Sequence, residues 1–345
     1  SENILALEIK LYEELIESLR KDVSYLQESA IAIGVIDMLA SFADIALTNN
    51  YVRPEIHEGT EILIRDGRHP IVENMISGGY VPNDLEMSAY DKQIMILTGA
   101  NMSGKSTYMR CAALICIMAQ MGSFVPASFA KIGIVDRIFT RVGASDDLAG
   151  GQSTFMVEML ELANILNNAT DRSLILLDEI GRGTSTVDGY SIARAVLEYI
   201  HGKGGKGPRT LFATHFHQLI SMEGEMKRIR NFHFAVKENK QEITFLRKLI
   251  PGATDRSYGI HVAKIAGVPK KVLVRADEIL KSTLKCDTGS GQKYYTQMLL
   301  VDTPEAEDKE SKVEERLREV NPNDITPMQA LMLISELKGI MEDKN

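Results

Sequence analysis

A glycine-rich segment near residue 100 has the residue types and spacing of a phosphate-binding loop. It contains Gly99-x-x-x-x-Gly104-Lys105-Ser106 and follows a short apolar run, residues 94–97, that is typical of a buried strand. Glycines allow consecutive backbone N–H groups to surround a polyphosphate, the lysine can reach the β- and γ-phosphates, and the serine hydroxyl can bind Mg²⁺. A helix expected over residues 107–121 would direct its positive N-terminal end toward the phosphates. The segment therefore predicts a nucleotide site; a glycine turn without a ligand is the alternative.

Two adjacent acids, Asp178 and Glu179, follow the apolar stretch Leu174 to Leu177, which predicts a second strand of the same site. In a P-loop ATPase this Walker B arrangement brings the aspartate to the Mg²⁺ shell beside Ser106. The glutamate can then orient or deprotonate the attacking water. Ordinary strands also meet solvent at charged residues, so this interpretation depends on the P-loop.

His215 directly follows another predicted strand, residues 211–213. Because the carboxyl ends of parallel strands meet at one edge of a sheet, this histidine should lie beside the Walker acids and could sense the γ-phosphate. A loop histidine without a special role is the plain alternative. His215 and His217 could also suggest a metal, but no cysteine or further histidine has suitable spacing.

Strands and helices alternate between the P-loop and His215, which predicts an α/β fold. The further expected elements are a strand at 137–142, a helix at 154–169 and a helix after Gly189. This alternation implies right-handed crossovers and a mainly parallel sheet flanked by helices on both faces. Short extended pieces between Tyr51 and Met87 predict a small β element, and a helix from Lys270 to about Lys281 closes the domain.

Helical patterns lie at both ends of this α/β region. Apolar residues at steps of three and four predict a long helix up to about Thr48, interrupted near Gly34, or alternatively two antiparallel helices. Pro327 begins a short final helix with an apolar stripe. The predicted organisation is a helical segment at 1–50, a P-loop ATPase domain at 51–285, a charged linker at 286–322 and a small C-terminal helical element at 323–345.

Composition restricts the classes of partner. The 345 residues carry a formal net charge of −8 and the pI is about 5.5, which argues against a broad nucleic-acid-binding face. Three cysteines without metal-like spacing fit a reducing, cytoplasmic setting. The longest uninterrupted apolar run, Cys111 to Ala119, is too short to span a bilayer, so no membrane partner is expected. Because Ser1 lies within a helical pattern, we expect a fragment of a longer protein.

Four segments form a specific set: TGANMSGKSTYMR (98–110), STFMVEM (153–159), DEIGRGTST (178–186) and ATHFHQL (213–219). Together they resemble the ATPase region of the MutS family of DNA mismatch repair proteins. The resemblance implies an ABC-type ATPase that converts ATP to ADP and phosphate with Mg²⁺. It also implies a head-to-tail homodimer in which each ATP site is completed by the opposite subunit. The implied further partners are mismatched DNA, bound by domains absent here, and the protein MutL.

The resemblance implies roles for single residues. Ser153 matches the serine that acts in trans on the γ-phosphate of the opposite site, although it could also be a helix N-cap. Tyr80 matches the family's adenine-stacking position, which is usually phenylalanine. The predicted catalytic residues are Lys105, Glu179 and His215, and the predicted Mg²⁺ ligands are Ser106 and Asp178. The predicted phosphate-binding residues are Gly99, Ala100, Asn101, Met102, Ser103, Gly104, Lys105, Ser106 and Thr107. The family usually has Pro and Gly where this chain has Ala100 and Ser103, which could alter affinity.

The ends of the chain also resemble parts of the family. The first helix resembles the end of the lever that joins the DNA clamp to the ATPase, and the last helix resembles an oligomerisation element. The stretch Gln297 to Leu300 resembles the short peptide by which some bacterial members bind the sliding clamp. The sequence contains no Phe-x-Glu mismatch wedge. The alternative is a nucleotide-gated interaction switch of a MutS2-like recombination or ribosome-rescue protein, whose nuclease tail this ending does not resemble.

Overall fold

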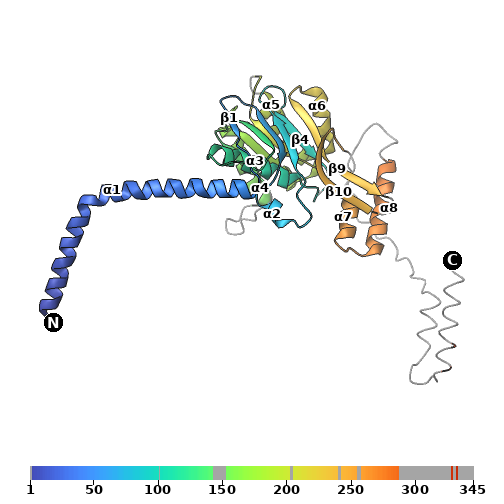
Figure 1. Ribbon diagram of the computed structural model, residues 1–345. Helices are drawn as coiled ribbons and strands as arrows, with labels where there is room; N and C mark the ends of the chain where they lie inside the picture. Colours follow the sequence, from blue (N-terminus) through green and yellow to red (C-terminus); the bar gives the residue numbers. More distant parts are fainter. Residues whose placement is uncertain are drawn as a thin grey trace. The chain divides into compact units, whose positions relative to one another are not determined.

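The computed structural model describes residues 2–100, 102–142, 153–202, 205–239, 242–254 and 258–286, together with residues 328 and 332. The chain divides into two compact units, residues 1–280 and 281–345, and the elements that position the site belong to the first (Figure 1). The predicted sliding-clamp peptide and most of the predicted C-terminal element lie outside the described residues.

The N-terminal segment forms one long helix, α1 (Glu2–Thr48). It runs without interruption through Gly34, so the alternative of two antiparallel helices is wrong. Of its residues only Ala46 is buried. An 18-residue window of α1 has a mean hydropathy of 2.0, long and apolar enough to cross a membrane by length and composition alone. The core helix of a soluble protein or a signal sequence meets the same criterion. The expectation of no membrane partner rests on uninterrupted apolar runs and does not take this window into account.

A small four-stranded sheet precedes and flanks the P-loop region. Its strand order is β1-β5-β2-β3. The strands are β1 (Glu55–His57), β2 (Ile62–Gly67), β3 (Asn83–Met87) and β5 (Phe129–Gly133), with the short helix α2 (Val72–Met75) between β2 and β3. β2 is antiparallel to both of its neighbours, whereas β1 and β5 are parallel. The sheet confirms the predicted small β element and adds β5, which the sequence analysis did not anticipate.

A six-stranded sheet carries the site. Its order is β10-β9-β4-β8-β7-β6, and only the β9–β10 pair is antiparallel. The strands are β4 (Ile94–Thr98), β6 (Ile138–Arg141), β7 (Leu174–Asp178), β8 (Arg209–Ala213), β9 (Ile229–Asn239) and β10 (Glu242–Pro251). Every residue of β4 and β8 is buried, since both faces of a parallel sheet are covered. This explains the apolar run at the start of β4, whereas β8 begins with buried Arg209 and Thr210 before its apolar residues. The prediction of a mainly parallel sheet is therefore confirmed in part: it holds for the neighbours from β6 to β9, whereas the β9–β10 hairpin and the mixed four-stranded sheet depart from it.

Helices cover both faces of this sheet (Figure 1). On one face, α3 (Lys105–Gln120) packs with side chains of the four-stranded sheet around Leu97 and Leu176. The other face carries α4 (Thr154–Asn168), α5 (Thr186–Gly202), η1 (His217–Ser221) and α6 (Met222–Glu225). Each fully buried Leu or Ile in these layers contributes about 1.5–3 kcal/mol, enough to hold the strand ends in fixed register.

Two helices begin earlier than predicted. α3 starts at Lys105, directly after the loop, and α5 starts at Thr186 rather than after Gly189. The start of α5 is capped by Ser185, whose Oγ accepts a hydrogen bond from the Asp188 amide at 3.2 Å and donates to the Asp188 carboxylate at 2.8 Å. Two further helices, α7 (Gly259–Ile265) and α8 (Lys270–Cys286), complete the described elements.

Candidate active site

The P-loop connects the buried end of β4 to the first turn of α3. Three of its described residues have positive φ: Gly99 at 126°, Met102 at 69° and Gly104 at 108°. Left-handed backbone is costless for glycine and strained for methionine, so the turn is held by its surroundings. Its conformation directs the N-terminal end of α3, with its unpaired backbone N–H groups, into the loop. Asn101 lies outside the described residues.

Lys105, the first residue of α3, folds back over this loop. Its ammonium donates to the carbonyl oxygens of Gly99 at 2.7 Å and Ala100 at 3.0 Å, and the residue is 5% exposed. Burial is the largest influence on the pKa of Lys105 and lowers it, although the carboxylates of Glu179 and Asp178 oppose the shift. The two carbonyl bonds keep the ammonium at the loop, where an anionic ligand would meet it.

Ser106 and Asp178 meet across the carboxyl edge of the sheet. The serine Oγ donates to Oδ2 of the aspartate at 2.5 Å. The other carboxylate oxygen, Oδ1, is buried and has no hydrogen-bond partner. Burial raises the pKa of Asp178, and neighbouring Glu179 adds to the rise. A hydroxyl and a carboxylate with an unused oxygen fit Mg²⁺, which prefers oxygen ligands and takes few from protein.

The neighbouring acid, Glu179, is held by two basic side chains. Its Oε1 accepts a hydrogen bond from Nε2 of His215 at 2.8 Å, and its Oε2 pairs with the guanidinium of Arg182 at 2.5 Å. Burial alone would raise the pKa of Glu179, but the His215 bond and the Arg182 charge outweigh it, so the pKa is lowered. The residue has a positive φ of 61°, a left-handed backbone conformation that is uncommon outside glycine. A deprotonated carboxylate in a fixed orientation is suited to accept a proton.

Strand register explains why His215 reaches this acid. Asp178 pairs with Ala213 in the parallel β7–β8 ladder, and the amide of Glu179 donates to the Ala213 carbonyl at 2.9 Å. His215 follows two residues later, at the same edge. The prediction that these side chains lie together is confirmed. Among the described residues, no group of three or more His, Cys, Asp or Glu side chains has the arrangement of a metal site.

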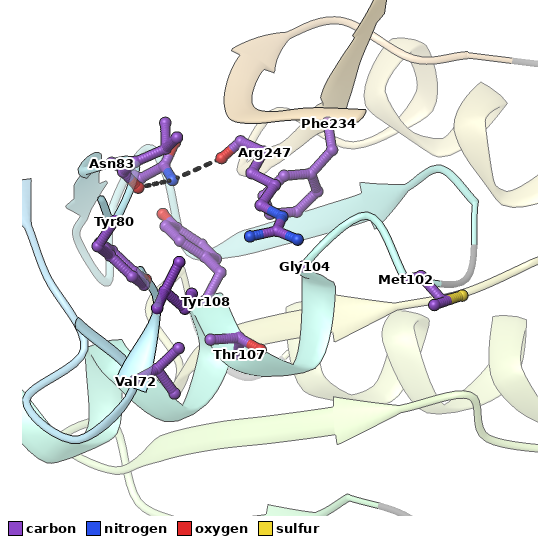
Figure 2. A pocket seen from close by; sticks show the side chains of 11 residues that line it. Val72, Tyr80, Asn83, Met102, Gly104, Thr107, Tyr108, Phe234 and Arg247 are labelled. Carbon is purple, nitrogen blue, oxygen red and sulfur yellow. Dashed lines mark hydrogen bonds between the residues drawn. The ribbon is translucent and has the colours of Figure 1, made fainter. Parts of the chain in front are cut away.

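A pocket of about 220 Å³ opens beside the first turn of α3. It is lined by Tyr80, by apolar and aromatic side chains that include those of α2 and β9, and by Arg247 of β10. The full lining is Val72, Ile76, Tyr80, Val81, Asn83, Met102, Gly104, Thr107, Tyr108, Phe234 and Arg247. Figure 2 shows the guanidinium of Arg247 extending from β10 toward the turn at Gly104, close to the ring of Phe234. A flat aromatic ligand portion suits such a lining.

The hairpin residues in this pocket are fixed by a bulge. Strand register shifts between Phe245 and Leu249, and Arg247 within this interval has a positive φ of 54°. Asn83 bridges the bulge: its Nδ2 donates to the Arg247 carbonyl at 2.9 Å, and its Oδ1 accepts from the Leu249 amide at 2.7 Å. The segment that carries Tyr80 is thereby tied to the hairpin that carries Phe234 and Arg247. Neither Phe234 nor Arg247 is predicted as a site residue from the sequence.

A family model described as MutS domain V matches residues 95–284, more than half of the chain. The chain belongs to the MutS family. A second family model, described as the DNA mismatch repair protein MutS C-terminal region, matches residues 304–340.

Curated MutS relatives agree with this assignment over nearly the whole chain. The DNA mismatch repair protein MutS of Methanosarcina mazei is 55% identical over 361 residues, which cover 99% of this chain and 40% of the relative. That of Methanococcoides burtonii is 56% identical over 353 residues, with 98% and 40% covered. That of Caldicellulosiruptor bescii is 48% identical over 347 residues, with 98% and 40% covered. The chain thus spans 40% of the length of these MutS proteins.

In this MutS chain, Ser153 occupies the N-cap of α4. Its Oγ accepts a hydrogen bond from the Met156 amide at 3.2 Å, and its side chain is exposed. The N-cap alternative is therefore confirmed. The proposed role in trans concerns a second subunit and stays a prediction.

Arg182 is a site residue for which no role is predicted from the sequence, although it lies within the motif DEIGRGTST. It follows Glu179 by three residues through a turn in which Gly181 also has a positive φ, 86°. The sequence signal that could have identified Arg182 is a basic residue three positions after Glu179.

Proposed function

We propose that this chain is the ATP-binding and ATP-hydrolysing dimerisation region of a MutS-type mismatch repair protein. The observation that carries the proposal is the joining of Ser106 to Asp178, and of Glu179 to His215, at the strand edge beside the P-loop. Serine, paired acids and a glycine-rich loop in this arrangement are suited to phosphoryl transfer to water. The reaction would yield ADP and phosphate.

The P-loop and Lys105 would bind the phosphates. Backbone N–H groups of residues 99–107 would surround the β-phosphate, and the Lys105 ammonium would exchange its two carbonyl partners for phosphate oxygens. Ser106 and Asp178 would hold Mg²⁺, which supplies charge neutralisation at the β- and γ-phosphates when bound.

Glu179 would act on the attacking water. As the water oxygen bonds to the γ-phosphorus and the bond to the β–γ bridging oxygen breaks, a proton from the water passes to the carboxylate. The lowered pKa of Glu179 keeps the carboxylate ionised and ready to accept it. His215 and Arg182 would hold the acid in place, and His215 would also register the presence of the γ-phosphate.

The pocket beside α3 would receive the adenine. Tyr80 would stack on the base, with Phe234 and Arg247 contributing from the hairpin. Together with the loop, this gives one continuous path for the nucleotide from base to γ-phosphate.

The wider proposals rest on family membership. Two copies would form a homodimer with composite ATP sites, each receiving Ser153 from the opposite subunit. Mismatched DNA would be bound by parts of the longer relatives that this chain does not cover, and MutL would bind in response to ATP. The domain boundaries given above, the cytoplasmic location and a sliding-clamp contact through Gln297 to Leu300 are proposals of the same kind. The MutS C-terminal match at 304–340 supports this account over a MutS2-like switch.

The test is a Glu179→Gln variant. Glutamine preserves the size of the side chain but accepts no proton, so we expect ATP binding within about threefold of wild type and turnover at least about 100-fold slower. ATP binding would be measured by filter retention and turnover by phosphate release. Lys105→Ala supplies the blank, with loss of binding, and Glu198→Gln on the exposed side of α5 is the matched control. Near-normal turnover by Glu179→Gln would contradict the assigned role.

A further inference from the structure

Glu158 is a buried acid of α4 that the mechanism above does not use. It is 6% exposed, and a carboxylate so deeply buried requires partners that compensate for its lost hydration. It lies one and a half turns beyond Ser153, on the face of α4 directed at the protein interior. Its position and its contacts both point to the loop that follows the Walker acids.

The carboxylate binds the backbone of that loop. Its Oε1 accepts a hydrogen bond from the Gly181 amide at 2.6 Å. Gly181 lies between Glu179 and Arg182, the two residues that form the 2.5 Å ion pair at the candidate active site. A charge-assisted bond to this amide therefore fixes the backbone between the acid and its basic partner.

The loop has little freedom to settle elsewhere. A Cβ on Gly181 would lie 2.6 Å from the Cα of Gly189 in α5, and one on Gly183 would lie 2.9 Å from the Phe155 Cβ in α4. Glu179 and Gly181 both have left-handed backbone, at φ of 61° and 86°. Such a conformation persists only where the surroundings determine it, and the Glu158 bond is the polar contact that does so from α4.

The second oxygen of Glu158 connects this loop to the sheet. Its Oε2 lies 3.8 Å from the guanidinium of Arg141, the last residue of β6, which is also buried. Arg141 pairs in register with Leu177, one residue before Asp178. The same guanidinium lies 3.1 Å from the more exposed Glu161, so Arg141 has a second acidic partner.

We propose that Glu158 is a positioning residue for Glu179. By holding the Gly181 amide it sets the left-handed turn that aims the Glu179 carboxylate at the attacking water, and it thereby joins α4 to the hydrolytic half of the site. The inference rests on the proposed ATPase function. In this role the essential contact of Glu158 is the hydrogen bond to Gly181, and the attraction to Arg141 is secondary. In a purely structural role the ion pair with Arg141 would be the essential contact.

Two substitutions separate these roles in the full 345-residue chain. Glu158→Gln loses the charge but keeps an oxygen that can accept from Gly181, whereas Glu158→Asp keeps the charge but is one methylene too short. We expect Glu158→Asp to lower kcat at least about tenfold, because a shift of about 1 Å in a catalytic group can cost two orders of magnitude. KM and ATP affinity should stay within about twofold, because no phosphate-binding group is moved.

Glu158→Gln should retain kcat within about threefold of wild type. Glu161→Gln, which weakens the other acidic partner of Arg141 and leaves Glu158 in place, should be near wild type. Thermal unfolding of all four proteins provides the stability comparison.

Equal loss of kcat in Glu158→Gln and Glu158→Asp, or a fall in ATP affinity that parallels kcat, would overturn the proposal in favour of a structural ion pair. Unchanged kcat in Glu158→Asp would also overturn it. If wild type itself shows no turnover above the Lys105→Ala blank, the proposed function fails first and is identified as the failure.

Discussion

Asp178 and Glu179 are neighbours in sequence, yet their environments shift their pKa values in opposite directions. Burial raises the pKa of Asp178, whereas the pKa of Glu179 is lowered because His215 and Arg182 outweigh its burial. Adjacent carboxyl groups with divergent pKa values are typical of sites in which each acid has a separate task. Here a cation beside Asp178 would lower the raised pKa of that carboxyl group, whereas Glu179 is ionised without a cation.

Tyr80 should determine the affinity for the base of the nucleotide. Replacing Tyr80 with alanine removes the stacking surface, so we expect the KM for ATP to rise about tenfold with little change in kcat, since base stacking on an aromatic contributes about 1–3 kcal/mol. Tyr80→Phe keeps the ring and loses only the hydroxyl, so it should stay near wild type. Steady-state kinetics of both variants provide the measurement. Equal KM values for the alanine and phenylalanine variants would contradict stacking.

At this scale the sequence predicted the residues whose positions follow from local motifs. Lys105 and Ser106 are fixed by the loop spacing, and Asp178, Glu179 and His215 by the common edge of parallel strands. Arg182 and Arg247 could not be placed in the same way. Both depend on left-handed backbone at non-glycine positions, Glu179 and Arg247 itself, which propensity alone does not favour.

The loop between β7 and α5 depends on close backbone contact at Gly189. A Cβ there would lie 2.2 Å from the Gly181 carbonyl oxygen, so Gly189→Ala should displace the loop that carries Glu179. We expect a loss of stability of about 1–3 kcal/mol and a reduced kcat. Gly202→Ala, at the end of the same helix with open space around it, is the matched control and should change stability by no more than about 1 kcal/mol. Chemical denaturation and phosphate release would measure both effects; indistinguishable variants would contradict the packing argument.

The two buried cysteines of α3 should resist alkylation in the folded protein. Burial raises the pKa of Cys111 and of Cys116 to about 12. Only the thiolate reacts, so at pH 8 about one thiol in ten thousand is reactive, and the fraction grows tenfold for each further pH unit. Iodoacetamide followed by peptide mass spectrometry should find both unmodified at pH 8 and modified after unfolding in urea. Modification of Cys116 in the folded chain at the unfolded rate would contradict its burial.

Among the elements, the buried strands were the easiest to predict and the β9–β10 hairpin the hardest. β4 and β7 each begin with a run of four apolar residues, and β8 ends with the apolar residues 211–213. Residues 229–251 instead mix charged and apolar side chains, as expected of strands toward the edge of a sheet, with a bulge that breaks the alternation. Their pairing is decided by contacts with β4 and Asn83, far away in sequence.

For the whole molecule, family membership offers an explanation for the exposed apolar surface of α1. The chain spans 40% of the length of its MutS relatives. Large apolar side chains along α1, such as Leu15 and Ile36, are more than half exposed. A helix with so much exposed apolar surface is one expected to find a neighbour in a larger assembly.

In the proposed dimer, each ATP site contains residues from both subunits. Lys105 and Glu179 would act in the subunit that binds the nucleotide, whereas Ser153 would act on the nucleotide of the opposite subunit. Ser153→Ala and Glu179→Gln should therefore each be inactive as homodimers. In a heterodimer of the two, the nucleotide site of the Ser153→Ala subunit has its own intact Glu179 and receives an intact Ser153 from the partner. The other site has both substitutions.

The most direct test of the account is the ATPase activity of that heterodimer. The two variants, produced together with different affinity tags, would be purified sequentially through both tags. We expect about half of the wild-type activity per dimer, because one of two symmetry-related sites is intact. A heterodimer of Lys105→Ala with Glu179→Gln, which has no intact site, should remain inactive. If the Ser153→Ala and Glu179→Gln heterodimer is no more active than its homodimers, the site is not shared between subunits and the account is contradicted.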